Sequence, residues 1–349
     1  MAKLAIFSAT PLSYRGGYEE FIGRLYERAK NNGYEIDLVE GPAWLFGFFT
    51  AIIGRRERFA HLQNNQGLSQ GWYERLKGAD VVYCKSEILD LAIVRLAVSS
   101  GKIVAGMHTP RRYPRRNQTL LRGLLYGPFL FRLFLGRAKL HLLTPAQEAE
   151  VADLRATTVV LENGVPEPLA VRTERVSCGA DGTFTAFFAG RFTDQKGVDR
   201  LKNLLALPRL GRLTIFGEGP MGDVISALAE EDGRVEVHGW ADRQSLQLAM
   251  THADVVVIPS RWEGLSLLAL EALRTGSLVL AQSIPVMESL RSEAIGVYTT
   301  DFDSPERIEK DLKKMWSSVP DPSAISAGAG ERFDSGRQCD RLLQELLRR

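Results

Sequence analysis

The sequence predicts an α/β protein with two doubly wound parallel sheets, and two observations carry the prediction. Short apolar runs alternate with helical patterns in each half of the chain, which is typical of parallel strands joined by helices. A stretch rich in proline and glycine separates the two halves, between residues 164 and 182. The length of 349 residues agrees with two domains.

Six strands are expected in each half. Those of the first half are Leu4–Ala9, Ile36–Val39, Val81–Cys84, Ile103–Met107, Leu140–Leu143 and Val159–Leu161. Those of the second half are Phe184–Ala189, Leu213–Phe216, Val235–Val237, Val255–Ile258, Leu278–Ala281 and Val297–Thr299. A helix from about Tyr18 to Asn32 follows the first strand, and an amphipathic helix is expected from Arg337 to Arg349.

Composition points to a cytoplasmic protein. Its three cysteines, Cys84, Cys178 and Cys339, are scattered and odd in number, which argues against a disulfide framework. The chain opens directly on a strand pattern, without the layout of a signal peptide, and its apolar stretches are too short to span a bilayer. No group of histidines and cysteines has zinc spacing, so no zinc site is expected.

Glu263 and Glu271 are the most informative residues of the second half. The uncharged run Val255–Pro259 predicts a strand buried on both faces, and Leu267–Thr275 predicts a helix with Ser266 as its N-cap. Glu263 would then lie in the turn at the carboxyl end of the strand, where open α/β sheets bind ligands. Two carboxylates there suit a ligand with several hydroxyl groups, because each can accept two hydrogen bonds at once.

Arg191 and Lys196 follow another predicted strand in the same half. An apolar run ends at Gly190, and Gly197 allows the backbone to approach a ligand closely. A fork-shaped guanidinium beside a compact ammonium suits a diphosphate.

These motifs resemble those of the retaining GT-B glycosyltransferases of family 4, the glycosyl transferases group 1. The two glutamates resemble the family's Glu-seven-Glu signature, and the Arg191 to Gly197 loop resembles its Gly-Arg, loop, Lys-Gly sequence. Weaker matches are the glycine turn at Gly217–Pro220, the strand that ends at Gly239 and Trp240 near the nucleotide base, and Asn163–Pro166.

The resemblance implies a GT-B fold, with two facing Rossmann-like domains and a C-terminal helix that returns to the first. The expected boundaries are 1–165 for the acceptor-side domain, 166–182 for a linker, 183–320 for the nucleotide-sugar domain and 321–349 for a helical tail.

The resemblance also implies roles for individual residues in a metal-independent sugar transfer from a nucleotide-diphosphate sugar, without a cofactor. Arg191 and Lys196 would stabilise the leaving diphosphate, and Glu271 would hold the ribose. Glu263 would hold sugar hydroxyls, with backbone N–H groups from Gly264, Leu265, Ser266 and Leu267. His108, at a strand end of the first half, would line the reacting centre. Gly16 and Gly17 would form a glycine loop at the donor phosphates, where the N-terminus of a helix favours negative charge.

Two alternatives stay open. Gly217–Gly222 also fits a Gly-x-Gly-x-x-Gly dinucleotide fingerprint, with Glu236 as the ribose contact, which would make the protein an NAD-dependent oxidoreductase. A GT-B scaffold that binds nucleotide sugars without turnover is the other. Asp301 and Asp303 could suggest a metal site, but Asp303 or Ser304 is better explained as a helix cap before Pro305.

The net charge of +2 is unevenly distributed. The first 165 residues carry +7 and the rest −5, and no acidic residue occurs from Leu91 to Gln147. Within Arg111–Arg137, basic residues alternate with large apolar ones, and Gly127-Pro128 is expected to break the helix. This pattern fits a peripheral surface for anionic lipid and a lipid-linked or polysaccharide acceptor, or else a buried helix pair with a solvated basic face. No nucleic-acid module is evident, so no nucleic-acid partner is expected.

Overall fold

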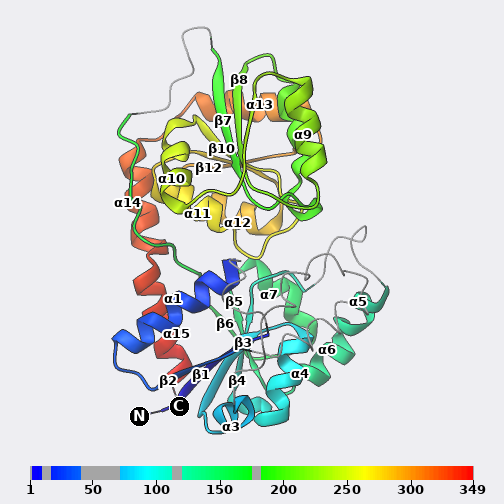
Figure 1. The fold of residues 1–349 in the computed structure, drawn as a ribbon, viewed down its shortest axis with the longest axis vertical. Helices are drawn as coiled ribbons and strands as arrows, with labels where there is room; N and C mark the ends of the chain where they lie inside the picture. Colours follow the sequence, from blue (N-terminus) through cyan, green and yellow to red (C-terminus); the bar gives the residue numbers. More distant parts are fainter. Residues whose placement is uncertain (1, 10–16, 41–70, 112–119, 175–181, 349) are drawn as a thin grey trace. The chain divides into compact units, whose positions relative to one another are not determined.

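Two parallel sheets, each of six strands, organise the chain (Figure 1). The structure, a computed structural model, describes residues 2–9, 17–40, 71–111, 120–174 and 182–348. The chain divides into two units, Met1–Asn163 with Ser335–Arg349, and Gly164–Asp334. All the strands that the sequence predicts are present, and the prediction of two Rossmann-like α/β domains is confirmed.

The first sheet has the order β2-β1-β3-β4-β5-β6. Its strands are β1 (Leu4–Ser8), β2 (Ile36–Glu40), β3 (Val81–Lys85), β4 (Ile103–Met107), β5 (Lys139–Leu142) and β6 (Thr158–Val160). Side chains of β1 alternate between two cores, because successive residues of a strand point to opposite faces. Leu4 and Ile6 pack against α1 (Gly17–Asn31) and α15 (Ser335–Leu347).

The other face of this sheet is covered by a second set of helices. Ala5 and Phe7 belong to a core shared with α3 (Trp72–Lys77), α4 (Ile88–Ala97), α6 (Pro128–Leu135) and α7 (Ala146–Val151). The helix break expected at Gly127-Pro128 is confirmed, because α5 (Leu120–Leu125) ends before it and α6 begins at Pro128.

The last helix returns to the first unit, as the sequence predicts. One face of α15 buries Cys339, Leu342 and Leu343 against the first sheet, beside α1 (Figure 1). Asp340 accepts hydrogen bonds from Arg28 on α1. The helical tail expected over 321–349 thus contains two helices, because α14 (Pro322–Phe333) belongs to the second unit and α15 to the first.

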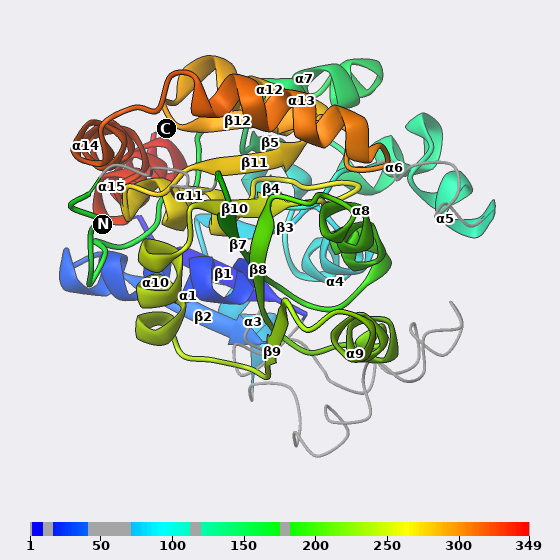
Figure 2. The same ribbon diagram turned by 90° about the horizontal axis from the view of Figure 1, so that it is seen from above.

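The second sheet has the order β12-β11-β10-β7-β8-β9. Its strands are β7 (Phe184–Ala189), β8 (Leu210–Phe216), β9 (Val235–His238), β10 (Val255–Ile258), β11 (Val279–Gln282) and β12 (Val297–Thr300). Its helices are α8 (Leu201–Leu205), α9 (Gly222–Glu231), α10 (Arg243–His252), α11 (Leu267–Arg274), α12 (Pro285–Glu293), α13 (Pro305–Trp316) and α14. In Figure 2, α13 runs along β12 and α9 lies beside β9.

Two central strands of this sheet determine where the site lies. β7 and β10 are neighbours in the middle of the sheet, and β10 is buried along its whole length, as its uncharged sequence predicts. Parallel neighbours present their carboxyl ends at the same edge of the sheet. The loops after β7 and β10, which carry Arg191, Lys196 and Glu263, therefore start side by side.

Part of the expected linker packs on the second unit. The Val165 N–H donates to the carbonyl of Phe333, and the Arg172 N–H donates to the carbonyl of Thr275. Residues 175–181 lie outside the described residues, as do Cys178 and the apolar segment 44–53.

Candidate functional site

Glu263 and Glu271 are separated by the first turn of α11. Glu263 precedes the helix, with 8% of its surface exposed, and Glu271 lies one turn into it. The Ser266 hydroxyl accepts a hydrogen bond from the Ala269 N–H at 3.4 Å, so the predicted N-cap is confirmed. Gly264 and Leu265 are buried between Glu263 and the cap, and Leu267 is the first helical residue.

The loop after β7 packs onto the end of β10. Lys196 ends a short 3-10 turn, Asp194–Lys196, and Gly197 follows with φ +64°. A Cβ at Gly197 would lie 2.2 Å from the carbonyl oxygen of Pro259, so only glycine allows this approach. Arg191 is exposed at the start of the loop.

An ion pair joins the two predicted motifs. The Lys196 ammonium Nζ lies 2.7 Å from Oε1 of Glu263. The carboxylate side chain is 7% exposed and the lysine side chain 28%, so the pair is largely shielded from solvent. The residues that the sequence assigns to diphosphate and to sugar are therefore in direct contact.

A second ion pair, which the sequence reasoning missed, fixes the same two loops. Arg261 lies in the loop after β10 and donates to both carboxylate oxygens of Asp199, at 2.8 and 2.7 Å. This hydrogen bonding lowers the pKa of Asp199. The Gln195 amide also donates to the carbonyl of Trp262 at 3.2 Å. The sequence did offer a signal for this pair, because Arg261 and Asp199 have opposite charges and each lies within one of the two recognised motifs.

Asp303 pairs with an arginine of the loop after β7. Arg200, beside Asp199, donates to Asp303 at 2.9 Å and to the carbonyl of Pro259 at 3.0 Å. Ser304 caps α13 by accepting from the Arg307 N–H at 3.2 Å, which confirms the cap interpretation. Within the described ranges, no three His, Cys, Asp or Glu side chains are grouped as metal ligands would be.

The glycines of the dinucleotide-like motif are explained by packing inside the second unit. A Cβ at Gly217 would lie 2.0 Å from the carbonyl oxygen of Gly190, and one at Gly219 would lie 2.6 Å from that of Phe192. Glu236, the expected ribose contact of that interpretation, pairs with Arg212 at 3.3 Å. The turn after β8 therefore supports the loop after β7, and the NAD-dependent alternative is not favoured.

Gly239 and Trp240 follow β9 at the same edge of the sheet. The Trp240 N–H donates to Oε1 of Glu218 at 3.3 Å, and a Cβ at Gly239 would lie 3.2 Å from the same oxygen. The Trp240 side chain is 62% exposed, so its ring offers an apolar surface beside the turn after β8.

Arg243, at the start of α10, lies next to the second signature glutamate. Its Nε is 3.8 Å from Oε1 of Glu271. Its Nη2 donates to the carbonyls of Pro166 and Glu167 at 3.1 and 3.0 Å. Arg243 thus places a positive charge beside Glu271. Its hydrogen bonds also hold residues 166 and 167 against the start of α10. No motif in the sequence indicates this role.

His108 is the predicted site residue of the first unit, at the carboxyl end of β4. Its ring packs against Tyr18 at 4.7 Å and Phe21 at 4.9 Å between centroids. Burial lowers the pKa of His108 well below its ordinary value, and the neighbouring His141 and Lys85 lower it further. Gly17 begins α1, whereas Gly16 lies outside the described residues.

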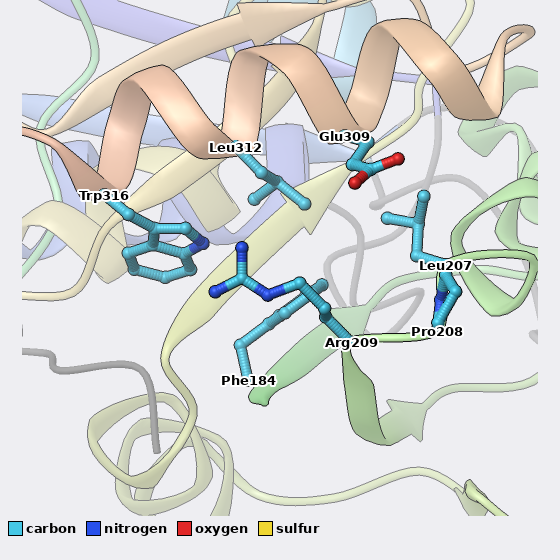
Figure 3. A pocket seen from close by; sticks show the side chains of 7 residues that line it. All are labelled: Phe184, Leu207, Pro208, Arg209, Glu309, Leu312 and Trp316. Carbon is cyan, nitrogen blue, oxygen red and sulfur yellow. The ribbon is translucent and has the colours of Figure 1, made fainter. Parts of the chain in front are cut away.

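A small hollow in the second unit lies away from these loops. Phe184, Leu207, Arg209 and Trp316 are among its lining residues (Figure 3). Its volume of about 10 Å³ is near the minimum that holds one water molecule, so no nucleotide fits. Phe184 begins β7, whereas Arg191 and Lys196 follow its carboxyl end.

Comparison with solved structures identifies the fold. Sucrose-phosphate synthase from Thermosynechococcus elongatus matches with a TM-score of 0.71 at 16% identity, over 99% of this chain and 98% of that one. Anabaena Alr3699/HepE in complex with UDP-glucose matches with a TM-score of 0.70 at 15% identity, over 99% of both chains. The lipopolysaccharide outer core galactosyltransferase WaaB matches with a TM-score of 0.67 at 17% identity, over 99% of this chain and 100% of that one. The chain has the GT-B fold.

Sequence comparison finds glycosyltransferase relatives of the second unit. Residues 172–331, which lie within the second unit, match the family model "Glycosyl transferases group 1". An uncharacterized glycosyltransferase, MJ1607 of Methanocaldococcus jannaschii, is 34% identical over 120 residues, 32% of this chain and 30% of that protein. An uncharacterized 41.2 kDa protein in the cps region of Klebsiella pneumoniae is 30% identical over 123 residues, 35% of this chain and 34% of that protein. The matched stretch spans about a third of the length of these relatives.

Proposed function

We propose that the protein is a retaining glycosyltransferase that moves a sugar from a nucleotide-diphosphate sugar to an acceptor. The observation that carries the proposal is the Lys196–Glu263 ion pair, which brings the two signature loops together at the carboxyl edge of the second sheet. A cation for a diphosphate and a carboxylate for hydroxyl groups lie side by side there, as a nucleotide sugar requires.

The donor would be held by the second unit. Lys196 and Arg191 balance the charge that develops on the departing diphosphate, aided by the N-terminus of α11. Glu271 accepts hydrogen bonds from the ribose, and Glu263 together with the backbone N–H groups of Gly264–Leu267 positions the sugar. Gly239 and Trp240 would adjoin the base, and Gly17 would contribute to binding of the donor phosphates.

The transfer would proceed on one face of the sugar. The bond from the anomeric carbon to the phosphate oxygen breaks, the bond to the acceptor oxygen forms, and the acceptor's proton passes to the departing phosphate. This arrangement needs neither a carboxylate nucleophile nor a metal ion, because Arg191 and Lys196 supply the positive charge. His108 lines the reacting centre.

A nucleotide-sugar donor agrees with what solved GT-B proteins contain. Alr3699/HepE was solved with UDP and glucose and with UDP-glucose, and a TarM mutant of S. aureus with fondaparinux, alpha-GlcNAc-glycerol and UDP. We expect this chain to bind a donor of the same chemical class.

A thermal-shift screen of UDP, GDP, ADP and CMP sugars tests the donor. The matching donor should raise the unfolding midpoint, because a ligand that binds the folded state stabilises it. Glu271→Ala should reduce this shift and the rate of nucleotide release, whereas Glu231→Ala, at an exposed glutamate of α9, should leave both unchanged. Full binding by Glu271→Ala would contradict the site assignment.

Two further measurements separate the alternatives. A fluorescence change with NADH, and none with nucleotide sugars, would favour the oxidoreductase. Binding of a nucleotide sugar without nucleotide release, with any of the acceptors tried, would favour the non-catalytic protein.

The acceptor would be lipid-linked or an envelope polysaccharide, reached from the cytoplasmic face of a membrane. One face of α6 buries Phe131 and Leu135 in the core that contains Ala5 and Phe7. For that face, the alternative of a buried helix is correct. The other face of α6 leaves Phe129 81% and Leu133 62% exposed, and Leu124 on α5 is 62% exposed. Exposed Arg132 and Arg137 accompany them. Large apolar side chains beside cations suit the boundary of an anionic bilayer.

This surface would bind peripherally. Among the described residues, no helix is both long and apolar enough to cross a membrane. Each basic residue near an anionic surface adds about 1 kcal/mol, so a few give reversible binding. Arg111, expected at the start of this surface, is instead buried at 2% exposure and donates to Asp153 and to the carbonyl of Glu150. Residues 112–119 lie outside the described residues.

Vesicle sedimentation tests this surface. The protein should pellet with anionic vesicles at low salt, less at high salt, and not with neutral vesicles, because salt screens the lipid charge. Phe129→Ser with Leu133→Ser should abolish pelleting. Leu248→Ser, at a leucine of α10 that is 52% exposed, is the matched control. Protein that stays in the supernatant with anionic vesicles at low salt would rule out membrane association.

A further inference from the structure

A row of hydrogen bonds runs through the first unit from Asn163 to Leu161, by way of His108. Nδ2 of Asn163 lies 3.3 Å from Nδ1 of His108, and Nε2 of His108 lies 2.9 Å from the Tyr83 hydroxyl. That hydroxyl lies 2.8 Å from Nδ1 of His141, whose Nε2 lies 2.7 Å from the carbonyl oxygen of Leu161. Tyr83 and His141 thus connect Nε2 of His108 to a backbone carbonyl, and the Asn163 amide contacts Nδ1 directly.

The carbonyl at the end of the row fixes the direction of every proton. A carbonyl only accepts, so Nε2 of His141 carries the proton and Nδ1 of the neutral ring is an acceptor. The single proton of the Tyr83 hydroxyl therefore points to His141. The Tyr83 oxygen then accepts from His108, which places a proton on Nε2 of His108. Nδ1 of His108 keeps its lone pair and accepts from the Asn163 amide.

The sheet is built to hold this row. Tyr83, His108 and His141 come from β3, the end of β4 and β5, which are consecutive in the sheet. Gly106 lies directly opposite His141 in the register of β4 and β5. A Cβ at Gly106 would lie 2.1 Å from the Tyr83 hydroxyl and 2.7 Å from Nε2 of His108. A glycine inside a strand often marks such a close approach, and here it provides the space where the hydroxyl meets the ring.

The surroundings favour uncharged rings. Tyr83 is fully buried and His141 is 1% exposed, and Tyr18 and Phe21 pack on the His108 ring. Burial lowers the pKa of His141 to about 4. Both rings are therefore neutral near pH 7, the state that the proton directions above require.

We propose that Tyr83 and His141 are positioning residues that hold His108 in one neutral tautomer, with the proton on Nε2 directed to Tyr83. Both ring nitrogens of His108 then form hydrogen bonds with the protein. The ring is therefore a fixed, uncharged surface at the reacting centre, and it transfers no proton. The tautomer does not depend on the proposed function, whereas its effect on sugar transfer rests on it.

Nitrogen-15 NMR of the histidine rings tests the tautomer without any substrate. At about pH 7, His108 and His141 should both show a protonated Nε2 and an unprotonated Nδ1, because each proton has a single acceptor in the row. His108→Gln and His141→Gln assign the two signals among the five histidines. In Tyr83→Phe the His108 signal should move toward averaged tautomers. A cationic His108 ring, or one protonated at Nδ1 in the native protein, would overturn the proposal.

Steady-state kinetics test the consequence. Tyr83→Phe should lower kcat by about 10- to 100-fold through displacement of His108 and leave KM for the donor unchanged, because the donor is held by the second unit. Tyr73→Phe, at a 40% exposed tyrosine of α3, should match the native enzyme.

His141→Asn gives a second variant should Tyr83→Phe fold poorly, and it should lower kcat in the same way. Native kcat in both folded variants would refute the positioning role. If NMR shows the expected tautomer but the protein processes no nucleotide sugar, the proposed function is refuted and the tautomer assignment still holds.

Discussion

Lys196→Ala is expected to lower the rate of nucleotide release by about 10²- to 10³-fold, the usual cost of removing one group that stabilises charge in a transition state. Lys196 is held 2.7 Å from Glu263 by the loop after β7, so its charge is already in place before the donor binds. Lys196→Arg should recover only part of the rate, since the planar guanidinium differs in shape from an ammonium. Nucleotide release over a range of donor concentrations measures the effect.

Stability must be separated from chemistry in this experiment. Removing Lys196 leaves the 8% exposed Glu263 carboxylate without its cation, which destabilises the loop. The double variant Lys196→Met with Glu263→Gln removes both charges and should restore the unfolding midpoint but not the activity. Lys202→Ala, at an exposed lysine of α8, is the control. Near-native rates in a folded Lys196→Ala enzyme would remove Lys196 from the site.

The strand pattern made the fold predictable. Uncharged runs such as Val255–Ile258 identify strands buried on both faces, and the alternation with helices identifies parallel sheets. The amphipathic period at the C-terminus identified α15, although only the recognised family placed it against the first unit. Ser266 and Ser304 were predictable as caps because capping depends on local sequence.

The partners of the site residues were not predictable, because they depend on strand order. Arg261 meets Asp199, and Arg243 approaches Glu271, only because the loops after β7, β9 and β10 start at the same edge of the sheet. The row through Tyr83 and His141 depends on the adjacency of β3, β4 and β5. Only Gly106, a glycine within a strand, hinted at a close approach there.

Asp90 is the group from which we expect the largest effect of pH on stability. It lies in the first turn of α4, is 5% exposed, and accepts a hydrogen bond from the Ala9 N–H at 3.2 Å. Burial raises the pKa of Asp90 from an ordinary 3.8 to about 7, although the charge of Lys85 opposes the change. Between these two values the folded protein holds a proton that the unfolded chain has released. Stability from this group is therefore present below about pH 4 and is lost as the pH rises through 7.

The size of this loss follows from the two pKa values. A difference of about three pKa units corresponds to about 4 kcal/mol in total, of which about 2 to 3 kcal/mol falls between pH 5 and pH 8. His141 acts in the opposite direction, because burial lowers its pKa to about 4 and its stabilisation is lost as the pH falls. The pH profile of the native protein alone therefore mixes the two groups.

Asp90→Asn separates them. The asparagine oxygen can still accept from the Ala9 N–H, but the side chain cannot ionise. Urea unfolding of the native and variant proteins at the same pH should show a stability advantage for Asp90→Asn that grows by about 2 to 3 kcal/mol from pH 5 to pH 8. Asp80→Asn is the matched control, because Asp80 also accepts one backbone N–H, from Lys3 at 2.8 Å, but is exposed. Its difference from the native protein should stay constant with pH. A constant difference for Asp90→Asn as well would mean that Asp90 ionises normally in the folded protein, and that its burial is relieved by charge or water at the carboxyl edge of the first sheet.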